Sequence, residues 1–468
     1  MSVGDNIRLL YIDLFCGAGG TSTGVEAAMM NGDKCAKVIA CVNHDRHAIA
    51  SHSANHPDAV HYTEDIRTLD ITELIEHEDK ERRKYPGSKV VLWASLECTN
   101  FSRAKGGLPR DADSRTLADH LFRYIEGLDP DYIQIENVEE FMSWGDLDDK
   151  GKPVSKDAGR LYMLWVSKVC SYGYHYDYRI LNSADYGAYT SRRRFFGIFA
   201  RKGLPISFPE PSHEKNPKNG IFGQLQPWKP VREVLDLNDE GKSIFGRKRP
   251  LVDATLKRIH AGLVKFVAGG KDAFLVKWNS MNRAGIYHAP GVDEPCPTIA
   301  TQNRLGVAKV SFLSKQFSGE PESKNITIDG PAGTITTKDR LACITPFIVN
   351  QYSGGGQVSD MDSPCYEDLP DFIKKVDDGL LYEVYESDSK AMVEIKLFMA
   401  MYGITDIKMR MLNETELKLI MGFPREYVLI GTQAEKKKYI GNAVVTIIPK
   451  VWAEALVMAN DLIYKNVI

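Results

Sequence analysis

Short apolar runs alternate with amphipathic stretches through the first 200 residues of the chain. Apolar runs of this length, separated by helix-like segments, predict buried strands in a mainly parallel sheet. The predicted strands are Leu9–Leu14, Val38–Val42, Val90–Ala94, Tyr132–Glu136, Tyr176–Leu181 and Arg194–Phe199. Helices are expected between them, notably over His47–Ala54 and Leu117–Gly127. The pattern predicts a doubly wound α/β fold, in which ligands gather at the carboxyl ends of the strands.

The first predicted strand runs directly into a glycine-rich turn, Phe15-Cys-Gly-Ala-Gly-Gly. Glycine allows backbone conformations that other residues avoid, so backbone in such a turn can lie close to a ligand. Thr21 or Ser22 could then cap a helix that continues to Met30. A strand, a glycine turn and a helix N-terminus together predict a nucleotide-like ligand at this edge of the sheet.

The composition changes near Gly203, and the next stretch is rich in Pro, Asn, Gly and Lys. Residues 293–305 then recur as residues 329–341, and short units that begin at Phe274, Phe312 and Phe347 recur at similar intervals. Short β-branched units with turns predict a smaller, irregular β-rich domain. A helical pattern is expected again from Met409, with a last helix over Ile448–Ile463. The predicted divisions are therefore residues 1–203, 204–404 and 405–468.

Bulk composition limits the classes of function only weakly. The 468 residues carry a formal net charge of −3, so a nucleic-acid partner would have to meet a local basic patch. Eight cysteines without regular spacing favour reduced intracellular thiols over a disulfide framework. No apolar run reaches the roughly 20 residues that cross a bilayer, and the first residues do not resemble a signal peptide. We expect a cytoplasmic protein without a membrane segment.

Two residues that carry chemistry follow neighbouring predicted strands. Cys98 comes just after the strand Val90–Ala94, and several cationic residues follow it in a glycine-containing loop. Nearby cations lower a thiol pKa, although one cysteine among eight is more often a buried structural thiol. Glu136 ends the next strand, 38 residues later, which leaves room for one helix and one strand between them. Both side chains can therefore reach the same crevice, although a strand-end carboxylate is often simply exposed.

The unbroken sequence Asp13-Leu-Phe-Cys-Gly-Ala-Gly-Gly resembles the first motif of the DNA cytosine-C5 methyltransferases, which holds S-adenosylmethionine. The resemblance implies that Cys98 is the nucleophile, although Leu96-Glu97 stands where the family has Pro-Pro. It implies that Glu136, within Glu-Asn-Val, grips the target cytosine. Arg192 and Arg194 match the two arginines of Gln-x-Arg-x-Arg, with Thr190 in place of the glutamine. Cys16, the thiol of the turn itself, is assigned to packing.

The same resemblance implies a set of cofactor-binding residues. Asn43 stands where the family generally has glutamate, so Asp45 is a rival for the ribose contact. The Asp65-Ile66 pair would recognise the adenine amine, and the last helix should return to close the site. The cofactor-binding set is Phe15, Gly17, Gly19, Asn43, His44, Asp65, Ile66, Leu117, Asn442 and Val444.

Five histidines crowd into the stretch between His44 and His61, and His52 and His56 have the helical spacing of a metal pair. A zinc site is the competing interpretation. No cysteine or acidic residue stands at a matching register, and the stretch overlaps the cofactor strand. We therefore predict no metal.

Taken together, the resemblance implies methyl transfer from S-adenosylmethionine to C5 of a flipped-out cytosine in a specific duplex sequence, through a covalent Cys98 adduct. The implied partner is double-stranded DNA, a cognate restriction endonuclease is a further candidate, and we expect a monomer. Two alternatives stay open: an RNA (tRNA) cytosine methyltransferase, and a DNA-binding homologue whose catalysis is impaired.

Residues 204–404 would then form the target-recognition domain. Base contacts are expected from Asn303 and Arg304 or from Asp339 and Arg340. The basic side chains expected to face phosphates are Lys215, Lys218, Lys229, Arg247, Lys248 and Arg249.

Overall fold

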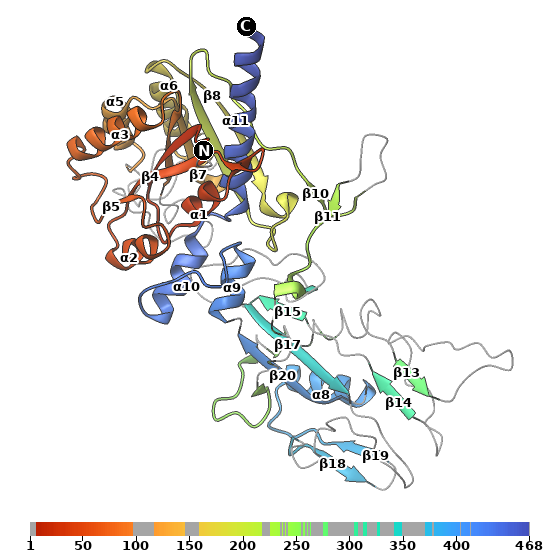
Figure 1. The fold of residues 1–468 in the computed structure, drawn as a ribbon. Helices are drawn as coiled ribbons and strands as arrows, with labels where there is room; N and C mark the ends of the chain where they lie inside the picture. The colour runs from red at the N-terminus through yellow and green to blue at the C-terminus, as the bar shows by residue number, and fades with distance from the viewer. Residues whose placement is uncertain are drawn as a thin grey trace, which may run out of the picture. The chain divides into compact units, whose positions relative to one another are not determined.

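The computed structural model describes residues 6–96, 117–145, 159–217, 225–234 and 413–467, with shorter stretches between residues 236 and 411. Its contacts divide the chain into two compact units. The first contains the described residues up to Val234 and those from Glu414 onward, and the second contains described residues between 235 and 413. Figure 1 shows the course of the chain through both units.

The first unit is built on a seven-stranded sheet. In the order of the sheet, its strands are β5 (Val60–Tyr62), β4 (Ala36–Val42), β1 (Leu9–Leu14), β6 (Lys89–Ser95), β7 (Tyr132–Asn137), β9 (Arg193–Arg201) and β8 (Tyr174–Asn182). The first five are parallel, and β9 is antiparallel to both of its neighbours. The mainly parallel, doubly wound sheet that the apolar runs predict is confirmed.

The direction in which the chain builds the sheet reverses between β1 and β6. From β1 it proceeds outward to β4 and β5, then returns and continues through β6 and β7 on the other side. Ligands of open α/β sheets bind at the carboxyl ends of the strands at such a reversal. The glycine turn follows β1, and the sequence that leads to Cys98 follows β6. Both segments therefore begin at the strands where the sheet order reverses.

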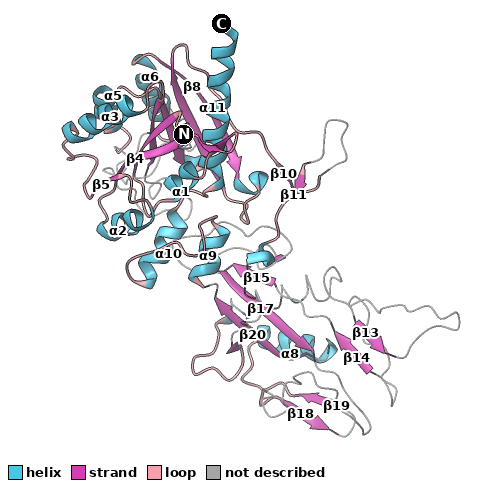
Figure 2. Cartoon of the chain, in the orientation of Figure 1, coloured by secondary structure: helices cyan, strands magenta, loops and turns pink. Residues whose placement is uncertain are grey.

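Helices cover both faces of the sheet, as Figures 1 and 2 show. The helices of this unit are α1 (Gly20–Glu26), α2 (Arg46–Asn55), α3 (Thr72–Lys84), α5 (Leu121–Leu128), α6 (Arg160–Ser171), α9 (Glu414–Ile420), α10 (Gln433–Asn442) and α11 (Ile447–Val467). Its smaller elements are β2 (Met29–Met30), β3 (Asp33–Lys34), β10 (His213–Glu214), β11 (Gln226–Pro227) and the 3₁₀ turns Glu139–Ser143, Ser183–Tyr186 and Val231–Val234.

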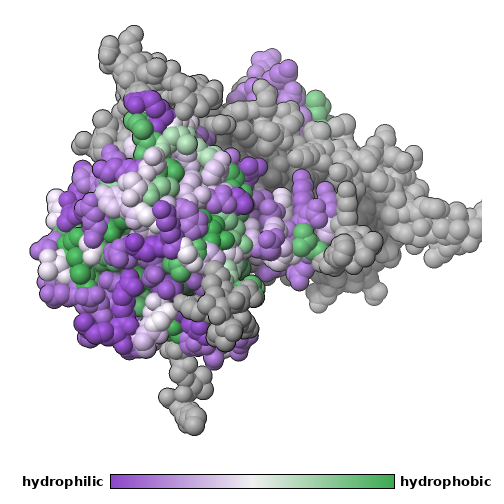
Figure 3. All heavy atoms as spheres, turned by 90° about the horizontal axis from the view of Figure 1, so that it is seen from above, coloured by the Kyte–Doolittle hydropathy of each residue, from purple (hydrophilic) through white to green (hydrophobic). Residues whose placement is uncertain are grey.

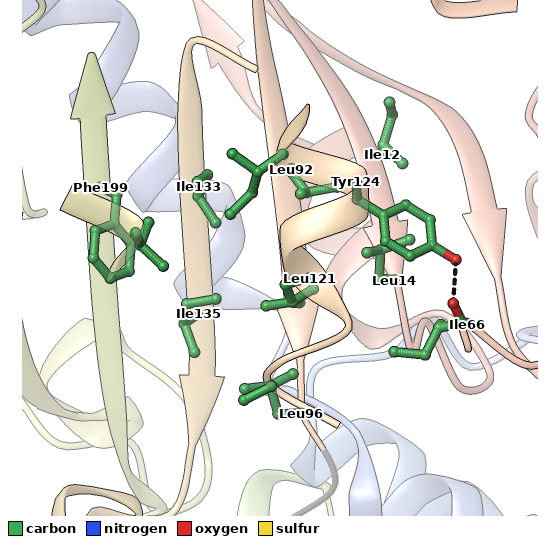
Figure 4. Packing of buried hydrophobic residues seen from close by; sticks show 14 of the residues in the cluster. Ile12, Leu14, Ile66, Leu92, Leu96, Leu121, Tyr124, Ile133, Ile135 and Phe199 are labelled. Atoms are coloured by element: carbon green, nitrogen blue, oxygen red, sulfur yellow. Dashed lines mark hydrogen bonds between the residues drawn. The ribbon is translucent and has the colours of Figure 1, made fainter. Parts of the chain in front are cut away.

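Alternation along β1 separates two hydrophobic clusters. Leu10, Ile12 and Leu14 belong to the cluster that includes residues of α3, α5 and α6. Figure 4 shows part of this packing, in which the Tyr124 hydroxyl also donates to the carbonyl of Ile66 at 2.9 Å. Leu9 and Tyr11 point the other way, into the cluster that includes residues of α1 and α11. Because side chains alternate along a strand, Asp13 belongs to this second face.

Three predicted element boundaries were wrong. Helix α1 begins at Gly20 and ends at Glu26, because Met29–Met30 instead pairs with Asp33–Lys34 around the turn at Asn31 and Gly32. Helix α5 begins at Leu121, four residues later than predicted. The stretch from Met409, expected to be helical, belongs to a strand up to Met411, and the helix begins at Glu414.

The second unit contains a five-stranded sheet and two separate hairpins. The sheet order is β12 (Lys242–Ser243), β20 (Ile404–Met411), β17 (Leu341–Ile348), β15 (Phe312–Lys315) and β16 (Asn325–Thr327). The hairpins pair β13 (Leu275–Trp278) with β14 (Arg304–Val307), and β18 (Ile373–Val376) with β19 (Gly379–Tyr382). Helix α8 (Lys390–Tyr402) supplies much of the buried core of this unit. Short strands in several small sheets match the irregular β-rich domain that the repeat predicts.

The division of the chain lies later than the predicted boundaries after residues 203 and 404. Beyond Gly203 the chain still packs in the first unit, where Trp452 donates to the carbonyl of Ser207 at 2.8 Å and Trp228 donates to Asp185 at 2.9 Å. Near the second boundary, β20 continues to Met411 because it pairs with β17 along its length. Local composition marks the change of pattern, but these long-range contacts set the division.

One helical stretch, Gln433–Leu462, is long and apolar enough by length and composition to cross a membrane. In the fold, 61% of its most apolar window is buried, as in the core helix of a globular domain. Its outer side still exposes Met458 and Leu462. Apolar residues also occur scattered among polar ones on the face drawn in Figure 3.

Candidate active site

The glycine turn after β1 has a left-handed backbone at three positions: Phe15 (φ 61°), Gly17 (φ 53°) and Gly19 (φ 101°). This conformation is uncommon for a residue with a side chain, and strained backbone of this kind gathers at functional sites. A Cβ added at Gly17 would meet nothing within 4 Å, so this side of the turn is open. The turn therefore has room for a ligand at the carboxyl end of β1.

The opposite side of the turn is packed against the C-terminal segment. A Cβ at Gly20 would lie 2.6 Å from the carbonyl oxygen of Val444, so only glycine fits there. The hydroxyl of Tyr427 donates to the carbonyl of Ala18 at 2.6 Å. Asn442 is exposed and Val444 is buried beside this contact. The C-terminal segment therefore returns to the catalytic unit, as predicted, and it packs against the glycine turn there.

Gly19 itself caps α1, in place of the predicted Thr21 or Ser22. Both of those side chains are buried, and the Ser22 hydroxyl donates to Asp13 at 2.8 Å. Cys16 is buried as well, and burial raises the pKa of its thiol well above the usual value. A protonated buried thiol is a poor nucleophile, in agreement with its assignment to packing.

The contacts just beyond β4 distinguish Asn43 from Asp45 as candidates for the ribose contact. Asp45 caps α2, accepting from the backbone N–H groups of His47 at 3.0 Å and Ala48 at 3.2 Å, and it also accepts from the hydroxyl of Tyr439. These bonds tie Asp45 to the first turn of α2 and to Tyr439 of α10, so Asp45 has a structural role. Asn43 is only partly buried, and its side-chain oxygen accepts from the backbone N–H of Asp45 at 2.9 Å. Asn43 remains the better candidate, next to the exposed His44.

The Asp65-Ile66 pair has one polar and one apolar member. Arg67 donates to both oxygens of Asp65, which lowers the pKa of that carboxyl to about 2, so it is ionised at neutral pH. Charge on His44 acts on Asp65 in the same direction, which brings these two predicted residues into one neighbourhood. Ile66 is buried in the hydrophobic cluster together with Leu117.

Glu136 lies at the carboxyl end of β7, opposite Ser95 of β6, and is 6% exposed. The nitrogen Nε of Arg194 lies 3.5 Å from one of its oxygens. Burial raises the pKa of Glu136, and Arg194, Arg192 and a hydrogen bond from Ser95 only partly oppose this shift. A carboxyl group with a raised pKa can hold a proton and donate it to a ring nitrogen.

The three consecutive arginines at the start of β9 differ in exposure. Arg193 is exposed and pairs with Glu139 at 3.0 Å, as predicted for the solvent-facing member. Arg192 is 4% exposed and donates to the carbonyl of Gly441 at 3.1 Å. The arginine motif and the Gly441-Asn-Ala-Val segment, almost 250 residues apart in sequence, therefore meet in the fold.

The predicted nucleophile Cys98 lies outside the described residues, which end at Leu96 in this stretch. Leu96 itself is buried, and its carbonyl accepts from the side chain of Asn137 at 3.4 Å. Asn137 thus anchors the chain at a position two residues before Cys98 in the sequence. Sequence matching finds Asn137 as part of Glu-Asn-Val but does not show this contact.

The predicted recognition residues are only partly covered by the structure. Lys218, Asn303, Asp339 and Arg340 lie outside the described residues, and Arg304 begins strand β14. Arg247 donates to the carbonyls of Ser243 and Lys242, so it supports the backbone of β12. The exposed basic residues among the predicted set are Lys215, Lys248 and Arg249, while Lys229 lies over the ring of Tyr189.

One reason for excluding a metal was wrong. The sequence places no cysteine beside the histidine pair, but the fold brings Cys41 to within 3.3 Å of the ring nitrogen of His52. His56, the expected partner of His52, instead lies near Thr23 and Tyr427.

The turn and the strand ends offer groups that suit S-adenosylmethionine chemically. The open side at Gly17 admits close backbone approach, Asn43 offers a polar group for hydroxyls, and Ile66 supplies an apolar wall. Asp65 is ionised and can accept from an amine. These are the requirements of a sulfonium nucleoside.

Comparison with known proteins gives the same family. The sequence model of the C-5 cytosine-specific DNA methylases matches residues 9–457. Type II methyltransferase M.AgeI of Thalassovita gelatinovora is 31% identical over 49% of this chain and 51% of that protein. M.XorII of Xanthomonas oryzae is 32% identical over 44% of each. The chain thus spans about half the length of these relatives.

A solved structure supports the fold. The structure of a DNMT2 mutant from Spodoptera frugiperda aligns with 96% of this chain and 99% of its own, with a TM-score of 0.50 and 12% identity. Such identity speaks for the fold alone, whereas the family match extends over almost the whole chain. The chain belongs to the C-5 cytosine-specific DNA methylase family.

Proposed function

We propose that this protein is a DNA (cytosine-5-)-methyltransferase that uses S-adenosylmethionine. The observation that carries the proposal is the ion pair of buried Glu136 and partly buried Arg194, at the edge of the sheet where β7 ends and β9 begins, next to β6. At the same edge, the glycine turn follows β1, and β6 is the strand that precedes Cys98 in the sequence.

Each protein group at the site would have a separate role toward the target base. Cys98 would add to C6 as a thiolate, C5 would then take the methyl group, and loss of the C5 proton would expel the Cys98 thiolate. Glu136, whose pKa burial raises, would donate a proton to N3 and accept from the exocyclic amine, while Arg194 would hold the carbonyl oxygen. Arg192, fixed by the Gly441 carbonyl, would position this strand end. S-adenosylmethionine, when bound against the glycine turn, supplies the electrophilic methyl group.

The reacting faces of cytosine are covered by stacking in a duplex, so the base must leave the helix to reach these groups. Double-stranded DNA is the proposed substrate because the second unit adds a separate β-rich body to the catalytic unit. We assign recognition of the DNA sequence to that unit. A restriction endonuclease as partner, a monomeric state and a cytoplasmic location remain predictions.

The test uses the full-length protein and labelled S-adenosylmethionine, with duplex DNA of mixed sequence and with tRNA. We expect label on DNA, at positions that bisulfite sequencing of the same DNA then locates. Label on tRNA and none on DNA would favour the RNA alternative.

A second test concerns the roles of the site residues. Glu136→Gln should lower kcat by about 100- to 1,000-fold, because the amide cannot replace the acid. Glu139→Gln, a matched change on the neighbouring exposed pair, should leave kcat within about twofold of the wild type. Cys98→Ala should abolish the covalent complex with 5-fluorocytosine DNA. Equal activity of Glu136→Gln and wild type would refute the assigned role, and absence of trapping in the wild type would favour an inactive homologue.

A further inference from the structure

Three potential metal ligands meet behind the glycine turn, apart from the residues assigned to the methyl transfer. Cys41 lies on β4, His52 on α2 and His61 on β5. One ligand atom from each can be chosen so that all three lie within 4.8 Å of one another. Cys41 and His52 are fully buried, and His61 is partly buried.

We propose that Cys41, His52 and His61 form a binding site for a zinc ion. Thiolate and imidazole are the donors that zinc prefers, and three protein ligands from separate elements are a common set. The geometry of the first two needs little change: Sγ of Cys41 lies 3.3 Å from Nε2 of His52, close to the separation of about 3.5 Å between two ligands of one tetrahedral zinc.

His61 must move to complete the set. Its Nε2 now lies 2.9 Å from Nδ1 of His52, the ring nitrogen that faces away from Cys41. One zinc takes only one nitrogen of a histidine, and Cys41 lies at Nε2, so the bound state requires the His61 ring to leave Nδ1 and turn toward the Cys41 side of His52. His61 stands on a three-residue edge strand and is only half-buried, so this shift encounters less resistance than a movement of His52.

The surroundings supply an outer shell. The hydroxyl of Ser22 lies 2.9 Å from Nε2 of His52, so an ion on this nitrogen would displace it from there, and the hydroxyl also donates to Asp13. The other oxygen of Asp13 is buried and has no hydrogen-bond partner among the described residues. Buried carboxylate oxygens normally have a donor, and a water molecule on the fourth position of the ion would provide one.

His56 stays outside the set, although its ring centre is 4.8 Å from that of His52. Its Nε2 lies 3.2 Å from the Thr23 hydroxyl and 3.3 Å from the Tyr427 hydroxyl. His52 is therefore joined by Cys41 and His61, two residues that the helical spacing of His52 and His56 does not indicate. An ion held by them would tie β4, α2 and β5 together directly behind Gly19.

The experiment measures metal binding by the full-length protein, without using activity. Protein treated with a chelator is dialysed against zinc, and bound metal is counted for the wild type, Cys41→Ser and His61→Asn. Cys170→Ser and His175→Asn are the matched controls, since Cys170 is a half-buried helical thiol and His175 an exposed strand residue. We expect both test variants to lose one equivalent of zinc that both controls retain.

Two further measurements guard against misfolding of the variants. Cobalt(II) in place of zinc should give the wild type a thiolate-to-cobalt absorption band, which Cys41→Ser removes and Cys170→Ser keeps. Zinc should also raise the melting temperature of the wild type by a few degrees and that of His61→Asn by clearly less. Equal zinc content in all five proteins, or a cobalt band that Cys41→Ser leaves unchanged, would overturn the proposal and leave a hydrogen-bonded cluster.

Discussion

The two faces of the central sheet are built by different means. One face, with α3, α5 and α6, is packed by aliphatic and aromatic side chains around Phe141 and Trp165. The other, with α1 and α11, also buries Asp13, Ser22 and His52 beside its apolar residues. Apolar contacts are interchangeable within limits of volume, whereas each buried polar group depends on a particular partner. The first face therefore supplies stability, and the second fixes the position of the glycine turn.

The largest expected effect lies on the apolar face. Phe141 is fully buried and its ring packs against those of Trp144, Tyr162 and Phe195. Phe141→Ala should lower the free energy of unfolding by about 3–5 kcal/mol, measured by denaturant titration. Leu164→Ala, at a position 54% exposed, is the control and should change it by less than about 0.5 kcal/mol. Comparable losses in both variants would remove the distinction between core and surface on this face.

A smaller loss is expected where α1 meets the C-terminal segment. Gly20→Ala places a Cβ too close to the carbonyl oxygen of Val444, so the backbone must move. This movement should lower the free energy of unfolding by about 1–3 kcal/mol. The same variant should weaken binding of S-adenosylmethionine, measured by calorimetry, because the turn shifts with it. Gly87→Ala offers the comparison, since φ is +86° there but the added methyl meets nothing within 4 Å. It should cost about 1–2 kcal/mol of backbone strain and leave cofactor binding unchanged.

The hydroxyl of Tyr439 on α10 donates to Asp45, just beyond the end of β4. Tyr439→Phe removes the donor to Asp45 and should lower the free energy of unfolding by about 1–2 kcal/mol. Tyr172→Phe removes an exposed hydrogen bond to Glu126 and should cost less than half as much. If the two variants lose the same stability in thermal unfolding, the buried polar contacts are no more important than those at the surface.

The smallest expected effect is a dependence of stability on pH. Burial acts to raise the pKa of Asp45, but hydrogen bonds from Ala48, Tyr439 and His47 outweigh it and hold the pKa below the usual 3.8. A lowered folded-state pKa contributes stability that is fully present above the unfolded value and lost as pH falls through the folded one. Between about pH 5 and pH 3, the melting temperature of the wild type should fall more steeply than that of Tyr439→Phe. Parallel curves would show that this carboxylate does not contribute to the acid sensitivity.

Much of the first unit follows from sequence because its cause is local. Apolar runs predict the strands to within a few residues, since a strand covered on both faces must be apolar throughout. Motif order likewise predicts the family, and residues such as Glu136 and Arg194 are found by their place after or before a strand. Helix α1 was misjudged because Thr21 and Ser22 are good caps in isolation, whereas contacts with the C-terminal segment place Gly19 at the cap.

The sheet, the glycine turn and the types of residue at the candidate site follow from the sequence alone, because strand formation and turn chemistry depend on neighbours in the chain. Only the tertiary structure decided that Asp45 is a helix cap, that Arg192 meets the Gly441 carbonyl and that Cys41 joins His52 and His61. These contacts join segments that are distant in sequence or lie on different elements. Their partners are chosen by packing of the sheet and its helices, which residue spacing does not encode.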